Sequence, residues 1–171
     1  MSSNPASSKT DIPLKGFKVT ISTKFDVSDL TISKFTKWAK KADMHHIVAE
    51  HGSSGTKHIH ALLCFKEPKI KRVLQDYIWK HHVKLHNEGA NIQKYAVRVD
   101  VLYDNKWHNE YLSKESTHEV ISSQYDADNE SEYYPIPGVK EELEGLTVRN
   151  ARSNFWDDAI SKFKTWWSNR H

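Results

Sequence analysis

The residues best suited to chemistry lie in the stretch EHGSSGTKHIHALLCF, residues 50–65. Two apolar runs flank the turn-rich GSSGT, so the stretch is predicted to form a β-hairpin. His58 and His60 alternate on the second strand and therefore share one face, about 7 Å apart. Glu50, just before the turn on the first strand, can add a carboxylate at the same point. Two imidazoles and one carboxylate leave coordination positions open, which is typical of a reactive metal site.

Two alternatives stay open for this stretch. A His-x-His pair is also an ordinary feature of a strand, and alone it does not predict a metal. His51 is the alternative third ligand, because it is the neighbour of Glu50. Since neighbours on a strand face opposite sides, only one of the two can face the histidine pair. The preference of hard cations for oxygen favours Glu50.

A second group lies some fifty residues downstream, in NKWHNEYLSKES, residues 105–116, which is predicted to be a short helix. Tyr111 and Lys114 are three residues apart and share a helix face, with Glu115 beside them as a further accessory candidate. With a metal that polarises a phosphate, Tyr111 would attack phosphorus and form a phosphotyrosine ester. Lys114 would orient the phosphate, stabilise charge or lower the pKa of the phenol, and the sequence leaves these roles open.

These motifs, in this order, resemble the HUH endonuclease domain of replication initiator (Rep) proteins. The resemblance is strongest to those of eukaryotic circular single-stranded DNA viruses such as geminiviruses and circoviruses. It rests on FKVTIST, EHGSSGTKHIHALL and YLSK, and covers residues 14–118. It implies an α+β fold, with an antiparallel five-stranded sheet flanked by helices in an RRM/ferredoxin-like topology. It also implies Glu50, His58 and His60 as ligands of Mn²⁺ or Mg²⁺, Tyr111 as the nucleophile and Lys114 as its accessory.

The resemblance further implies a function. Such proteins nick single-stranded DNA at a stem-loop origin, stay on the 5′ phosphate, release a 3′-OH for rolling-circle synthesis and later rejoin the ends. Many carry a helicase domain after the nuclease, but these 171 residues contain no Gly-Lys-Ser/Thr phosphate-binding loop, so no ATPase function is expected of them. A plasmid or phage initiator and a single-tyrosine transposase are alternatives within this class. A non-enzymatic RRM-like nucleic-acid-binding module is the alternative outside it.

The elements that must position these residues follow from hydrophobic periodicity. Alternation predicts strands, and spacings of three and four predict two helices, one ending near Ala42 and one beginning at Lys69 after Pro68 stops the preceding strand. The strands are predicted over residues 17–23, 45–50, 57–66 and 95–102.

The charge of the chain is unevenly distributed. Residues 116–144 contain eight acids and one base, a net −7, whereas the other 24 bases and 14 acids give +10. A basic body suits an anionic partner such as nucleic acid. Five basic residues are candidates for DNA contacts: Lys18, Lys69, Lys71, Arg72 and Arg98.

Composition predicts a disordered tail over 1–13, an acidic linker over 119–140 and an amphipathic helical segment over 141–171. The resemblance implies that residues 14–118 form the endonuclease domain. The aromatic stripe of the last segment predicts that it packs on the nuclease or mediates self-association. No apolar run approaches the ~20 residues of a membrane span. Without a secretory signal, and with a single cysteine, the chain is expected to be intracellular, in the host nucleus if it comes from a eukaryotic virus.

Overall fold

The computed structural model describes residues 11–23, 25–52, 55–84, 96–107, 118–136 and 163–169. The chain divides into two compact units, one of residues Pro13–Tyr134 and one of the two chain ends. In the first, called the sheet unit below, five strands pair antiparallel in the order β4-β1-β3-β2-β5. The strands are β1 (Pro13–Ile21), β2 (Met44–His51), β3 (Lys57–Ile70), β4 (Val97–Val101) and β5 (His118–Gln124).

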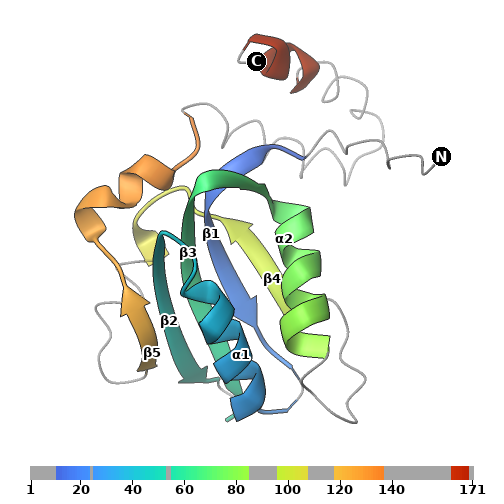
Figure 1. The fold of residues 1–171 in the computed structure, drawn as a ribbon, viewed down its shortest axis with the longest axis vertical. Coiled ribbons are helices and arrows are strands. Elements are labelled where there is room, and N and C mark those ends of the chain that lie inside the picture. Colours follow the sequence, from blue (N-terminus) through green and yellow to red (C-terminus); the bar gives the residue numbers. More distant parts are fainter. Residues whose placement is uncertain are drawn as a thin grey trace, which may run out of the picture. The chain divides into compact units, whose positions relative to one another are not determined.

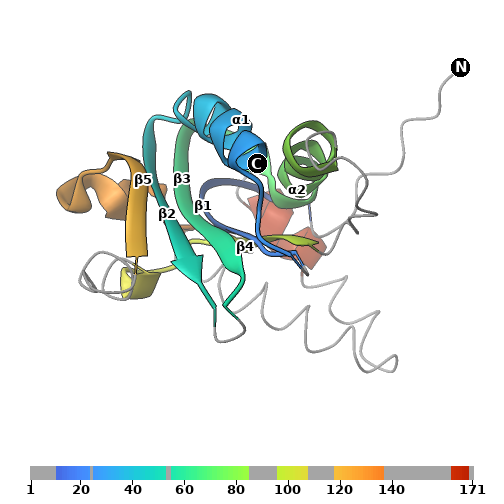
Figure 2. The ribbon, with the colours of Figure 1, turned by 90° about the horizontal axis from the view of Figure 1, so that it is seen from below.

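Two helices complete the sheet unit, α1 (Asp29–Ala39) and α2 (Lys71–Ile78), and a π-helical turn, η1 (Trp79–Lys84), continues α2. Both helices lie on the same face of the sheet (Figures 1 and 2). The order β1-α1-β2-β3-α2-β4 is that of ferredoxin-like folds, with β5 added beside β2. The predicted fold class, α+β with a five-stranded antiparallel sheet flanked by helices, is confirmed.

The start of α1 follows from local chemistry. Ser28 is the N-cap, and its hydroxyl accepts a hydrogen bond from the backbone N–H of Thr31 at 3.1 Å. Asp29 in the first turn and Lys37 in the last complement the helix dipole. The helix ends at Ala39, three residues before the predicted end.

Alternating apolar residues bury the helix-covered face of the sheet. Phe17, Val19 and Ile21 of β1 are all buried there. The Phe65 ring of β3 lies between Phe17 and Trp38 of α1, with centroid separations of 6.2 Å and 6.5 Å. This packing uses one side of each strand, so the residues between them face the opposite side of the sheet.

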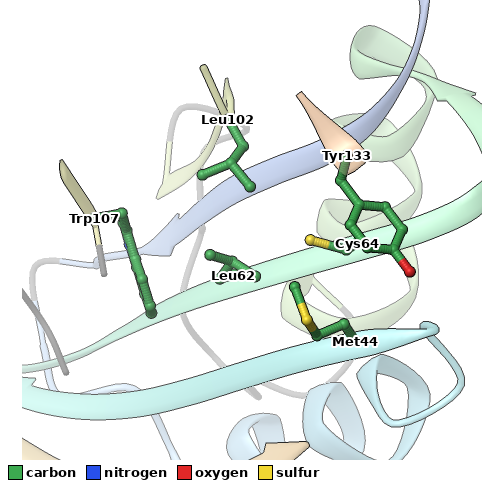
Figure 3. Close-up of a cluster of buried hydrophobic side chains, with 6 residues drawn as sticks. All are labelled: Met44, Leu62, Cys64, Leu102, Trp107 and Tyr133. Carbon is green, nitrogen blue, oxygen red and sulfur yellow. The ribbon is translucent and has the colours of Figure 1, made fainter. Parts of the chain in front are cut away.

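A smaller cluster covers part of that opposite face (Figure 3). Its buried members come from β2 and β3, from the residues after β4 and from a 3-10 helix, η3 (Ala127–Tyr133): Met44, Leu62, Cys64, Leu102, Trp107 and Tyr133. Behind it, the buried carboxylate of Glu130 accepts hydrogen bonds from the hydroxyls of Tyr125, at 2.8 Å, and Tyr134. Burial and these bonds to the carboxylate raise the pKa of both tyrosines.

The region predicted to be an acidic linker, 119–140, differs in the structure. Residues His118–Gln124 form β5 and Ala127–Tyr133 form η3, both within the sheet unit. The acidic composition indicates solvent exposure, but pairing with β2 and burial of the Tyr133 ring hold this region against the sheet. The rest of the predicted linker, 137–140, lies outside the described residues.

Pro68 does not end its strand as predicted. β3 continues to Ile70, and α2 begins at Lys71 rather than Lys69. The register of β3 against β1 shifts between Leu14 and Gly16, so the proline falls at an irregular part of the pairing. Proline is tolerated at such irregularities because no ladder hydrogen bond is required of it there.

Residues 163–169 are helical, within the predicted C-terminal helical segment. The rings of Phe163, Trp166 and Trp167 contact one another, with centroids 6.0–6.2 Å apart. The described residues include no helix with the length and apolar character needed to cross a membrane.

Candidate metal centre

The hairpin of β2 and β3 positions the three predicted ligands. Its register pairs Glu50 directly with His58, and Val48 with His60, so all three side chains share the sheet face opposite the helices. The turn is closed by hydrogen bonds from the N–H of Gly52 to the carbonyl of Thr56, at 3.0 Å, and from the N–H of Gly55 to the carbonyl of Gly52, at 2.8 Å. Gly55 has φ of 81°, a conformation that favours glycine.

The three side chains converge on one point. One oxygen of Glu50, Oε2, lies 3.3 Å from Nε2 of His58 and 3.1 Å from Nε2 of His60. The two imidazole rings are nearly perpendicular, at 82°, with centroids 4.7 Å apart. One ligand atom from each residue lies within 4.8 Å of the others, so the group can hold a metal ion. Among the described residues, no other group of histidine, cysteine and carboxylate side chains does so.

Both histidines are supported from behind by their other ring nitrogen. Nδ1 of His60 lies 3.3 Å from the hydroxyl of Thr20 on β1. Nδ1 of His58 lies 3.3 Å from the carbonyl of Thr56 in the turn, to which it can donate. Such contacts fix the ring orientation and leave Nε2 directed at the shared point, as in protein metal sites.

The electrostatics keep His60 neutral. Burial, together with the nearby His58, lowers the pKa of His60 to about 4, although Glu50 acts in the opposite direction. At neutral pH the ring therefore has a lone pair on one nitrogen, the form that binds a metal ion. The three side chains keep 13–26% of their surface exposed, so the site is sheltered but open.

His118 is a member of this neighbourhood that the sequence reasoning missed. Its Nδ1 lies 3.9 Å from the second oxygen of Glu50, Oε1, and its side chain is 3% exposed. The sequence pattern treats it as an ordinary surface or packing histidine, because the strand that carries it falls where a linker is predicted. Only knowledge of the β2–β5 pairing reveals the contact.

His51, the alternative third ligand, is separated from the group. It pairs with Lys57 and is exposed, one position along β2 from Glu50 and therefore on the other face. Tyr111, Lys114 and Glu115 lie outside the described residues, which stop at Trp107 and resume at His118. Trp107 packs on the same sheet face as the metal group, with its ring 5.7 Å from that of His46.

The candidate DNA-contacting residues separate into two sets. Lys18 and Arg98 share the face of the metal group, because Thr20, which contacts His60, pairs with Arg98, and Lys18 lies two residues before it. The Arg98 side chain is 75% exposed and pairs with Asp100 at 2.9 Å. Lys69, Lys71 and Arg72 instead lie at the junction of β3 with α2, where Lys69 stacks over Phe65 on the helix-covered face.

Two imidazoles and one carboxylate, all partly exposed, thus form a group that could hold a metal ion. Comparisons of the chain with protein-family models, with curated proteins and with solved structures found no match.

Proposed function

We propose that this chain is a metal-dependent endonuclease that nicks single-stranded DNA at a stem-loop origin of rolling-circle replication and rejoins the ends. The observation that carries the proposal is the group of Glu50, His58 and His60, whose ligand atoms lie within 4.8 Å of one another. A group built only for stability would be closed, whereas these three side chains remain partly exposed on the sheet face opposite α1 and α2.

The donor set favours a cation that accepts both nitrogen and oxygen, and Mn²⁺ or Mg²⁺ is proposed. When bound, such an ion would supply Lewis-acid polarisation of a phosphoryl oxygen. The chain's own contribution is positioning. Thr20 and the carbonyl of Thr56 hold the two imidazoles, and Glu50 contributes the negative charge.

Tyr111 is the proposed nucleophile. It follows Trp107 by four residues, so its Cα lies within about 14 Å of that of Trp107. Trp107 belongs to the buried cluster that contains Leu62, which is two residues beyond His60 on the same face of β3. Chain connectivity therefore permits Tyr111 to reach the metal group.

In the proposed step, the Tyr111 oxygen attacks phosphorus and loses its proton to a base. The bond from phosphorus to the 3′ oxygen breaks, and that oxygen leaves as a 3′-OH after taking up a proton. The 5′ phosphate remains on the tyrosine as a diester. The bond energy is retained, so attack by a 3′-OH reverses the step and rejoins the strand. Lys114 is proposed to assist at the phosphate.

The electrostatics of the face support an anionic strand as the substrate. Lys18 and Arg98 lie on the same sheet face as the metal group, and basic residues beside a cation site attract a phosphate backbone. Asp100 balances the charge of Arg98, so Lys18 carries most of this attraction. Lys69, Lys71 and Arg72 lie away from this face and are assigned no part in the reaction.

A non-enzymatic RRM-like module is the second candidate, favoured by the shared order of strands and helices. RRM sheets stack bases on aromatic side chains of the open face. Here the corresponding positions of β1 and β3 carry Lys18, Thr20, His58 and His60, which favours the enzyme.

The test is incubation with a mixed-sequence single-stranded DNA library and Mn²⁺, followed by denaturation. A covalent protein–DNA adduct is expected, and sequencing of the released 3′ ends identifies the cut. Tyr111→Phe removes only the hydroxyl and is expected to abolish the adduct. Tyr77→Phe, a substitution on α2 over the opposite face, is the matched control and is expected to keep it.

The metal requirement is tested in the same assay. Glu50→Ala is expected to lose the adduct, and His51→Ala, its neighbour on the other face, is expected to retain it. An intact Tyr111→Phe protein that still couples to DNA would move the nucleophile elsewhere. Binding of DNA without any adduct in the wild type would favour the RRM-like candidate.

A further inference from the structure

Glu50 stands at the centre of a row of three residues across the sheet. In the register of the strands it pairs with His58 on β3 and with His118 on β5. Directly opposed residues point to the same face, so the carboxylate has one imidazole on each side.

The two oxygens of Glu50 face different partners. Oε2 faces both ligand histidines, at 3.3 Å and 3.1 Å. Oε1 faces Nδ1 of His118, at 3.9 Å. This second contact is about 1 Å longer than a hydrogen bond, so a small rotation of the carboxylate closes it. His118 is not among the residues whose ligand atoms lie within 4.8 Å of one another, so it contacts the carboxylate and not the metal position.

His118 is held in place by its surroundings. Its side chain is 3% exposed, so its ring is fixed by packing. Along the same strand, Ser122 and Ser123 bond to His45 and His46 of β2, at 2.8 Å and 2.6 Å. Because its ring is buried, His118 can restrict the rotation of a partner that is itself 26% exposed.

We propose that His118 is a positioning residue for Glu50: its imidazole holds Oε1 and thereby keeps Oε2 directed between His58 and His60. A neutral imidazole with its proton on Nδ1 is enough for this contact, so the proposal requires no change of protonation. It rests on the metal site of the proposed function but not on DNA cleavage. Outer partners of metal ligands commonly contribute about 10- to 100-fold in affinity.

The experiment measures Mn²⁺ affinity by calorimetry in the full chain. His118→Ala is expected to weaken binding by about 10- to 100-fold. His118→Asn, whose amide N–H takes the place of Nδ1, is expected to restore most of it. Ser123→Ala removes the contact to His46 on the same strand and is expected to bind as the wild type does. If His118→Ala does not fold, His118→Leu fills the buried space without a donor and takes its place.

Each other outcome overturns a defined part. Wild-type affinity in the Ala or Leu variant, or equal loss in the Asn variant, removes the role of His118 as a donor. If Ser123→Ala loses as much Mn²⁺ affinity as His118→Ala does, weaker attachment of β5 to β2 explains both losses, and the proposal is overturned. A wild type that does not bind Mn²⁺ overturns the metal site and with it both proposals. If the Mn²⁺ affinities of the variants are as expected but the wild type forms no covalent adduct with DNA, the proposed function is refuted. The role of His118 at the metal group then still holds.

Discussion

Gly52 is a residue whose size, rather than its flexibility, matters to the metal group. A Cβ added there would lie 3.2 Å from Cε1 of His58, tighter than ordinary contact, so the ring would have to move. Gly55, in the same turn, has open space around a Cβ but φ of 81°. A substitution at Gly52 therefore tests crowding of the His58 ring, whereas a substitution at Gly55 tests backbone strain in the turn.

Gly52→Ala is expected to weaken Mn²⁺ binding several-fold with little change in melting temperature, because the turn conformation remains allowed. Gly55→Ala is expected to lower stability by about 1 kcal/mol and to leave the affinity of the folded protein unchanged. Calorimetry and thermal unfolding of both variants measure the two effects. The opposite pattern would mean that His58 adjusts freely and that the turn controls the site through its backbone.

The sequence predicts the three residues of the metal group but not the residues from other strands that contact them. His58 and His60 follow from the period of two on a strand, and Glu50 follows from its place before the turn. Thr20 and His118 belong to strands far away in the chain, and only the pairing of β1 with β3 and of β5 with β2 brings them to the group. Local periodicity carries no information on which distant strands become neighbours.

At the scale of elements, β5 is attached to β2 through a histidine that loses its proton readily. Nε2 of His45 lies 2.8 Å from the hydroxyl of Ser122. Burial, and then the charge of Lys40, lower the pKa of His45 from its ordinary value of 6.5. Between that value and the lowered one, the unfolded chain binds a proton that the folded chain does not. Acidification therefore favours unfolding in this interval.

The contribution of His45 to the free energy of unfolding is expected to be constant above pH 6.5. Below pH 6.5 this contribution is expected to fall as the pH drops. His45→Gln, whose amide can bond to Ser122, is expected to flatten part of this dependence. Lys40→Gln is expected to reduce it, because the pKa of His45 rises toward its ordinary value. Urea unfolding at a series of pH values, in metal-free buffer, measures the slopes. If the free energy of unfolding depends on pH equally in the wild type, His45→Gln and Lys40→Gln, then His45 is not the source of this dependence.

The elements that sequence patterns missed are those without a buried face. The strands that cover the core carry buried apolar residues and were predicted, whereas every residue of β5, His118–Gln124, is exposed or half-buried. Its stability comes from the backbone ladder and from the two histidine–serine contacts. In η3, two tyrosine hydroxyls compensate the burial of Glu130, which composition alone marks as a solvated acid.

For the whole molecule, the compact sheet unit extends to Tyr134, beyond the domain end predicted at residue 118. A protein of residues 11–136 is expected to unfold in one cooperative transition. A protein that ends at 118 loses β5 and the Tyr133 ring, and removal of a buried aromatic alone costs about 3–5 kcal/mol. It is expected to be unfolded or to melt far lower. Circular dichroism during heating compares the two, and equal melting temperatures would restore the boundary at 118.

The anchoring of Trp107 and of His118 on one sheet face has a consequence for chain length. The ten residues between them, 108–117, lie outside the described residues, and the entropy cost of closing a connection between two anchored points grows only with the logarithm of its length, about 0.6 kcal/mol for each doubling. Insertions there should leave the fold nearly as stable as before. Under the proposed function, the effective concentration of Tyr111 at the metal group would fall with the same power of the tether length, about 3-fold for each doubling. If the chain is the proposed endonuclease, a longer segment would therefore lower the folding equilibrium constant and the rate of strand cleavage by the same modest factor.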